Sequence, residues 1–204
     1  YYYMQVQSSG HYSPEFNELA NAMPQMIWVG LQDGTIIYIN SRVHEYQGAQ
    51  HLPDGSWDWH RMIHPDDLEQ TLQHWADARE NGTDFEVEHR LCTKTGEYRW
   101  HLNRAKPQIG HAGIVTRWYG SSTDIHLQKE AERAFRSSEA AFRASFENAS
   151  VGMAQVDATT GELLRVNHAF SVMMQRDEVE LHKLRFKDFL YPESRDTDWT
   201  LLQS

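Results

Sequence analysis

The sequence predicts an α+β domain built on an antiparallel sheet, and three observations indicate this class. Three β-rich segments follow one another over residues 83–125, with turn residues between them. A shorter β-rich hairpin occupies residues 26–40. Helical runs lie between these two groups and after the second one. Short turns join antiparallel strands, so each group is expected to pair with itself.

The first 40 residues are expected to form a lead, a short helix and a hairpin. Residues 1–12 are polar and rich in tyrosine, and we expect a flexible lead. Ser13 and Pro14 predict a helix start, as an N-cap followed by a proline in the first turn. Residues 26–31 and 35–40 are β-rich runs on either side of an Asp-Gly turn, which predicts a hairpin.

Residues 41–82 are expected to form short helical segments, a loop at residues 48–55 and one longer helix. One or two helical turns fit residues 41–47, and a tryptophan-rich short helix or turn fits residues 56–62. A longer helix is expected to begin at His64-Pro65, because two aspartates follow at the positive end of its dipole. Asn81-Gly82 supplies the left-handed residue that ends it.

The three later segments show the period of two that is typical of strands. In the first, the side chains at Phe85, Val87, His89 and Leu91 alternate with polar ones. In the second, one face carries Tyr98, Trp100 and Leu102, and the other carries Arg99, His101 and Asn103. A turn at residues 94–96 joins these two, and the third segment follows from Ile114. Together they predict an antiparallel meander.

A continuous helix is predicted directly after the meander, because residues 126–148 contain no glycine or proline. Its small and apolar side chains recur every three or four residues, at Ala131, Phe135, Ser138, Phe142 and Phe146. This narrow stripe favours pairing with a second copy of the helix. The alternative is an amphipathic helix that lies on its own domain.

The chain repeats itself at an offset of 127 residues. Gly34 and Gly161 are related by this offset, as are Asn40 and Asn167, and Pro65 and Pro192. The second copy lacks any counterpart of the meander. It is therefore expected to be poorly ordered, or to be completed by strands from another chain.

Composition excludes several classes of function. The net charge of −10 argues against a nucleic-acid surface. The single cysteine, Cys92, excludes an internal disulfide and a multi-cysteine zinc site. No run of about 18 apolar residues and no signal-peptide pattern occur. We expect no direct membrane contact and a cytoplasmic location, although a longer parent protein could carry a membrane anchor.

The order of elements and several motifs resemble the PAS sensor fold with a C-terminal PAC motif, as found in bacterial sensor histidine kinases and diguanylate cyclases. The motifs are DGTI with Asn40, IHPDD at residues 63–67, FEVEHR at 85–90, GEYRW at 96–100, WYG at 118–120 and TDI at 123–125. The predicted organisation is a lead at 1–12, a PAS domain at 13–126, a linker helix at 127–148 and part of a second PAS domain at 149–204.

The resemblance implies a five-stranded antiparallel sheet of order 2-1-5-4-3, with helices over one face that enclose a pocket. It implies a sensory input module that signals through the linker helix of a homodimer, and we expect the parent to be a histidine kinase. Trp118, Asp124 and Ile125 are the expected relay to that helix. The pocket is expected to involve Trp28, Tyr38, Asn40, Trp59, His74, Trp100 and Arg104.

The sequence gives less support for a bound cofactor or for catalysis than for a sensory role. His74 lies on the helix that supplies an axial ligand in haem-binding relatives, and His60 is a lesser candidate. The flavin-attaching cysteine of photosensor relatives is missing, so only noncovalent flavin stacked on tryptophan remains open. His64 beside two aspartates is explained as a helix cap rather than a metal site. No catalytic constellation is evident. The alternatives are a diguanylate cyclase input module, a haem-based gas sensor and a ligand-free scaffold.

Overall fold

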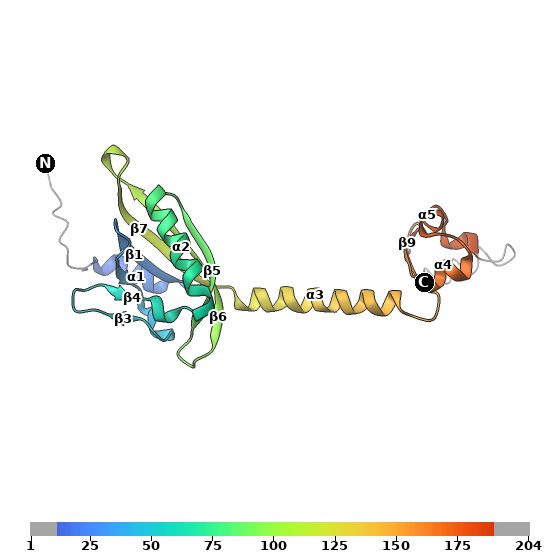
Figure 1. Cartoon of the computed structure of the whole chain (residues 1–204), viewed down its shortest axis with the longest axis horizontal. Coiled ribbons are helices and arrows are strands. Elements are labelled where there is room, and N and C mark those ends of the chain that lie inside the picture. Colours follow the sequence, from blue (N-terminus) through green and yellow to red (C-terminus); the bar gives the residue numbers. More distant parts are fainter. Residues whose placement is uncertain (1–11, 190–204) are drawn as a thin grey trace. The chain divides into compact units, whose positions relative to one another are not determined.

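A computed structural model describes residues 12–189 of the chain, which divides into two compact units between Ala131 and Glu132. Each unit is considered by itself. Figure 1 shows the elements of the first unit. They are α1 (Pro14–Ala22), β1 (Met26–Leu31), β2 (Ile36–Ile39), η1 (Ser41–Glu45), β3 (Gln50–His51), β4 (Trp57–Asp58), η2 (His60–Met62), α2 (Pro65–Asn81), β5 (Phe85–Cys92), β6 (Tyr98–Ile109), η3 (His111–Gly113) and β7 (Val115–Asp124).

The sheet of the first unit is antiparallel, with five strands in the order β2-β1-β7-β6-β5. The short β3 and β4 pair with each other outside this sheet. When the five strands of this sheet are renumbered 1 to 5 in chain order, their order in the sheet is the predicted 2-1-5-4-3. The α+β class and the predicted topology are therefore confirmed.

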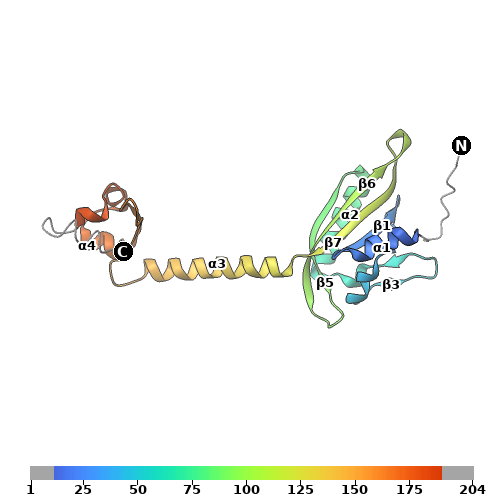
Figure 2. The ribbon, with the colours of Figure 1, turned by 180° about the vertical axis from the view of Figure 1, so that it is seen from behind.

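Helices cover both faces of the sheet at different places. Helix α2 lies over one face, and in the reverse view it is seen behind β6 and β7 (Figures 1 and 2). The core on this side contains Trp28, Trp75 and Trp118. Helix α1 covers the opposite face at β1 and β2, where Val29 is fully buried and Phe16 contacts Tyr38. The face under α2 is called the inner face below.

Helix α2 has the predicted ends, and its first turn also ties it to β5. The His64 side chain accepts a hydrogen bond from Asp66 N, and Gly82 ends the helix in the left-handed conformation. Asp67 accepts hydrogen bonds from the Arg90 guanidinium at 2.8 and 2.7 Å and from Arg90 N at 2.9 Å. These hydrogen bonds and the positive charge of Arg90 hold the pKa of Asp67 below its usual range. The first turn of α2 is therefore fixed against the sheet.

On β5, the side chains that face inward are the more apolar set, as the alternation predicts. On β6, the less apolar of the two sets faces inward. Phe85, Val87, His89 and Leu91 are all buried. On β6, His101 lies opposite His89, and Asn103 lies opposite Val87. Directly opposed residues point to the same face, so Arg99, His101 and Asn103 belong to the inner set. Trp100 and Leu102 point outward.

The second unit contains a hairpin and short helices, and α3 (His126–Glu147) connects it to the first unit. Its elements are β8 (Ala154–Val156), β9 (Leu163–Val166), α4 (His168–Met174), α5 (Glu178–Leu181) and η4 (Phe186–Phe189). Leu163, Val166 and Leu181 form its core. The helix predicted over residues 126–148 and the second hairpin are confirmed. Pro192 lies outside the described residues, and completion by another chain stays a prediction.

The repeat is visible in one buried side chain of each unit. Asn40 accepts a hydrogen bond from Ile27 N at 3.1 Å and donates to Ala20 O and Gln25 O at 2.7 and 3.0 Å. Asn167 does the same with Met153 N, Phe146 O and Val151 O, all between 2.8 and 2.9 Å. In each unit the buried amide forms hydrogen bonds that connect the first strand of the hairpin to the preceding helix. Phe146 belongs to α3, so the end of α3 takes the place that α1 has in the first unit.

Candidate functional site

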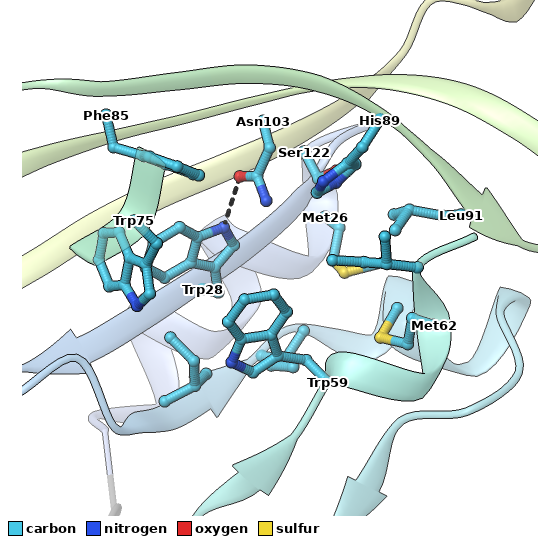
Figure 3. A pocket seen from close by; sticks show the side chains of 13 residues that line it. Met26, Trp28, Trp59, Met62, Trp75, Phe85, His89, Leu91, Asn103 and Ser122 are labelled. Atoms are coloured by element: carbon cyan, nitrogen blue, oxygen red, sulfur yellow. Dashed lines mark hydrogen bonds between the residues drawn. The ribbon is translucent and has the colours of Figure 1, made fainter. Parts of the chain in front are cut away.

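A cavity of about 50 Å³ lies in the first unit between the inner face of the sheet and the segment that carries η2 and α2 (Figure 3). Its walls are mostly apolar, and Trp28 and Trp59 face each other across it. The lining residues are Met26, Trp28, Ile36, Ile39, Trp59, Met62, Ile63, Trp75, Phe85, His89, Leu91, Asn103 and Ser122. Large side chains leave room for a few small atoms only.

Trp28 is fixed in the cavity wall by a glycine and a hydrogen bond. It pairs with Gly120 across β1 and β7, and a Cβ atom at Gly120 would overlap the indole ring. The indole therefore lies flat on the backbone of β7. Its Nε1 donates to Asn103 Oδ1 at 3.1 Å, the contact drawn as a dashed line in Figure 3. This bond occupies the oxygen of the Asn103 amide and leaves its N–H groups at the cavity.

His89 is a buried neutral base with one free nitrogen. The Thr71 hydroxyl donates its single hydrogen to Asp67 O at 2.8 Å, so it accepts from His89 Nδ1 at 3.1 Å. The hydrogen of the ring then sits on Nδ1, and Nε2 carries a lone pair. His89 is 1% exposed, and its Nε2 has no hydrogen-bond partner among the described residues. Burial first, and the neighbouring His101 second, lower the pKa of His89 to about 4.

Ser122 adds a second unpartnered polar atom to the cavity. The residue is 3% exposed, and its Oγ makes no hydrogen bond to any residue of 12–189. It lies directly opposite Asn103 across β6 and β7, and its side chain therefore shares the inner face. His89, Asn103 and Ser122 thus form a polar group on a wall that is otherwise apolar, and we call them the polar triad.

Only Trp28 and Trp59 of the seven predicted pocket residues line the cavity; Tyr38, Asn40, His74, Trp100 and Arg104 do not. Tyr38 lies on the outer face, because an irregularity in the β1–β2 register puts it opposite Val29 rather than on the side of Ile36. Its ring contacts Tyr12 and Phe16. The amide of Asn40 is used in fastening α1, as described above.

The other three residues, His74, Trp100 and Arg104, also lie outside the cavity. His74 lies on the exposed side of α2, so the structure does not bring its imidazole to this cavity. Trp100 points outward from β6, with Arg90 and Lys129 at 5.3 and 5.9 Å from its ring. Arg104 is an exposed ion-pair partner of Glu86 at 2.7 Å. His60 likewise binds Asp58, at 2.8 Å, on the surface.

Sequence reasoning missed the polar triad as a unit. The alternation in β5 did place His89 among inward-facing residues, and that was the available signal. Asn103 and Ser122 lie in polar stretches whose facing is set by strand register alone. Within the described part of the chain, no group of three or more His, Cys, Asp or Glu side chains is placed to hold a metal ion. Over the same residues, no helix is long and apolar enough to cross a membrane.

Two of the three predicted relay residues, Asp124 and Ile125, lie where β6 and β7 meet α3. Asp124 accepts a hydrogen bond from Arg99 Nε at 2.7 Å and from His126 N, in the first turn of α3, at 2.8 Å. Burial raises the pKa of Asp124, but these bonds outweigh it and hold the value below the usual range. Ile125 N donates to Trp100 O at 2.9 Å. Trp118 is fully buried instead, against Trp75 in the core.

Two buried histidines connect the cavity to this junction. His101 lies opposite His89 in the sheet and is fully buried. Its Nδ1 donates to Arg99 O at 2.8 Å, so its Nε2 accepts from Tyr46 Oη at 2.7 Å. Arg99 in turn binds Asp124. The series therefore runs from His89 to its cross-strand neighbour His101, on to the backbone carbonyl of Arg99, and through the Arg99 side chain to Asp124 at the first turn of α3.

The fold and the site define a class of protein: a sensor-type domain, in which one antiparallel sheet lines a buried cavity and holds an exit helix. Family models agree with this class. The model described as "PAS fold" matches residues 36–122, and the model described as "PAS domain" matches residues 140–204. The chain belongs to the PAS family and carries two PAS regions, the second of which is only partly covered.

Curated relatives are similar over part of the chain. The chain is 33% identical over 135 residues to the uncharacterized protein y4lL of Sinorhizobium fredii, and 34% identical over 100 residues to the peroxide stress-activated histidine kinase mak1 of Schizosaccharomyces pombe. These regions cover 65% and 49% of this chain, but only 16% and 6% of the relatives. The chain therefore spans a small part of the proteins it matches.

A solved structure of a sensory box histidine kinase/response regulator from Burkholderia thailandensis is also similar. It is 26% identical, with a TM-score of 0.48, over 64% of this chain and 98% of that one.

Proposed function

We propose that this chain is the sensory input module of a signal-transduction protein, and that the parent protein is a sensor histidine kinase. Two PAS regions joined by one helix support the sensory role. The similarity to a named histidine kinase supports the kinase assignment. In this proposal the module carries no catalytic step of its own. It regulates an output domain in the parent.

The observation that carries the proposal is that the same two strands line the cavity and hold the exit helix. On β6, Asn103 faces the cavity and Arg99 donates a hydrogen bond to Asp124. On β7, Ser122 faces the cavity and Asp124 caps the first turn of α3. A shift of these strands on ligand binding would act directly on the start of α3. A packed sheet edge joined to a rigid helix can have two discrete arrangements, which transmission requires.

The exposed stripe of α3 supports a homodimer as the form that transmits the signal. Leu127, Phe135 and Phe142 are 71%, 71% and 51% exposed. Together with Ala131 and Ser138 they recur every three or four residues along the helix, which is the spacing of a coiled-coil seam. Burying this stripe against a second copy would remove three large apolar side chains from water.

The dimer part is tested with multi-angle light scattering on the 204-residue chain over a range of concentrations. Phe135→Glu is expected to shift the chain toward monomer, because it puts a charge into the seam. Arg143→Glu is the control, since that residue pairs with Glu139 on the helix surface. A wild-type chain that stays monomeric at high micromolar concentration would remove the dimer from the proposal.

The relay part is tested in a fusion of residues 1–204 to the autokinase core of a sensor histidine kinase. Asp124→Asn weakens the bond to Arg99 and is expected to change autophosphorylation at least severalfold. Asp84→Asn is the matched control, because Asp84 forms an exposed ion pair with Lys106 at 3.3 Å, away from α3. Equal autophosphorylation in both variants and the wild type would contradict the relay.

A further inference from the structure

We propose that the cavity of the first unit binds a small uncharged molecule with a hydroxyl group, of the size of a short-chain alcohol. The hydroxyl would donate to His89 Nε2 and accept from Ser122 Oγ or from the amide of Asn103. This inference rests on the proposed sensory function and names the chemical class of its ligand. It is carried by two polar atoms, each on a side chain that is at least 97% buried, that line the cavity without a partner.

The hydrogen-bonding roles of the polar triad select a group that both donates and accepts. His89 presents a lone pair, since its Nδ1 hydrogen is directed at Thr71. Ser122 presents a hydroxyl, and Asn103 presents N–H groups, since its oxygen accepts from Trp28. A hydroxyl can satisfy an acceptor and a donor at once. Leaving buried polar atoms without partners costs free energy, so a ligand that pairs them gains affinity.

The charges around the cavity argue against an anionic ligand. None of the residues that line it is lysine or arginine. The nearest guanidinium to His89 along the strand, on Arg90, is bound to Asp67 and lies outside the cavity lining. A buried carboxylate would have no opposite charge to offset its loss of hydration. A neutral ligand meets no such cost.

The volume and the apolar walls of the cavity limit the size and polarity of the remainder of the ligand. A volume of about 50 Å³ holds a few water molecules or about two to four non-hydrogen atoms. Met26, Met62 and Leu91 lie on the side of the cavity near His89 (Figure 3). They would contact a short alkyl chain. A larger ligand would require Trp59 to move, because its ring forms the wall opposite Trp28.

The test is a titration of the 204-residue chain at neutral pH with propan-1-ol and, separately, with propionate. The readout is the imidazole nitrogen and carbon resonances of His89, observed by NMR. The free protein is expected to show His89 with its hydrogen on Nδ1. Propan-1-ol is expected to shift the Nε2 resonance saturably, whereas propionate is expected to leave it unchanged.

Ser122→Ala is expected to weaken the binding of propan-1-ol about fivefold, the effect of one lost hydrogen bond. Ser121→Ala is the matched control, because the neighbouring side chain points to the other face of β7 and does not line the cavity. The His89 resonance of each variant, recorded without ligand, reports whether the cavity is intact.

Several results would overturn the proposal: a hydrogen on Nε2 in the free protein, equal binding of propionate, equal affinity of both serine variants, or no saturable shift with the alcohol. The last would mean that the cavity holds ordered water only. A Soret band in the purified protein would also overturn it. The relay test does not depend on the ligand, so a failure here with a positive relay leaves the sensory function standing.

Discussion

Lowering the pH from 7 to 4 is expected to destabilise the first unit by about 3 kcal/mol through His89 alone. In the unfolded chain the imidazole takes up a proton near its ordinary pKa of 6.5, whereas in the folded chain burial delays this to about 4. Between these values the unfolded state binds more protons, so the free energy of unfolding falls as the pH falls. A difference of about 2.5 pKa values corresponds to about 3 kcal/mol.

The neighbouring aspartates titrate outside this pH range, whereas His101 does not, so a His89 variant is needed to isolate the effect. Burial is the main cause, His101 on the neighbouring strand acts in the same direction, and Asp67 on α2 opposes both. Asp67 and Asp124 have lowered pKa values, so their contribution to stability is lost mainly below pH 4. His101 titrates in the same direction as His89, because it too is buried.

The assay is urea denaturation followed by tryptophan fluorescence at pH 7, 6, 5 and 4. Six of the seven tryptophans lie before residue 120, so the signal reports mainly the first unit. The control is His89→Gln, which has no titrating group and can still contact Thr71. Its free energy of unfolding is expected to fall much less over the same range. If wild type and variant lose stability in parallel, the assignment of His89 as a buried neutral base is wrong.

Three further predictions concern packing and the junction. Asn40→Ala is expected to lower the free energy of unfolding by about 3 kcal/mol, because the three hydrogen bonds of a buried side chain are lost; urea denaturation checks this. Gly120→Ala is expected to cost about 2 kcal/mol or more by displacing Trp28. Gly30→Ala, whose new Cβ would make an ordinary 3.4 Å contact, should cost clearly less, and equal losses would contradict the packing argument. Asp124→Asn is expected to speed amide hydrogen exchange in the first turn of α3, whereas unchanged exchange would show that the cap does not depend on the Arg99 contact.

The order of elements was accessible from the sequence because it depends on local signals. The Pro-Asp-Asp start of α2 and the left-handed Gly82 are read from neighbouring residues. The period of two in β5 and the absence of helix breakers in α3 are local as well. The internal repeat gave Asn167 its counterpart, Asn40, before any contact was known.

Which side chains of β6 point to the inner face could not be predicted from local signals in the sequence. Both faces of the strand carry large side chains, and the more apolar set, which includes Trp100, suggested the wrong one. Its register with β5 decided the matter by placing His101 opposite His89. Trp100 then packs on the outer side, against Arg90 and Lys129. Tyr38 was misplaced for a similar reason, since an irregularity between β1 and β2 changes its face.

The sequence by itself determined the α+β class and the two-copy organisation, because these follow from periodicity, turn residues and repetition. The strand order was implied by the resemblance to the PAS fold. Only the tertiary structure decided which side chains share the cavity. His89, Asn103 and Ser122 come from three strands, and no local pattern relates them. Their proximity, and the unpaired atoms that they direct inward, result from strand register and from the packing of Trp28 on Gly120.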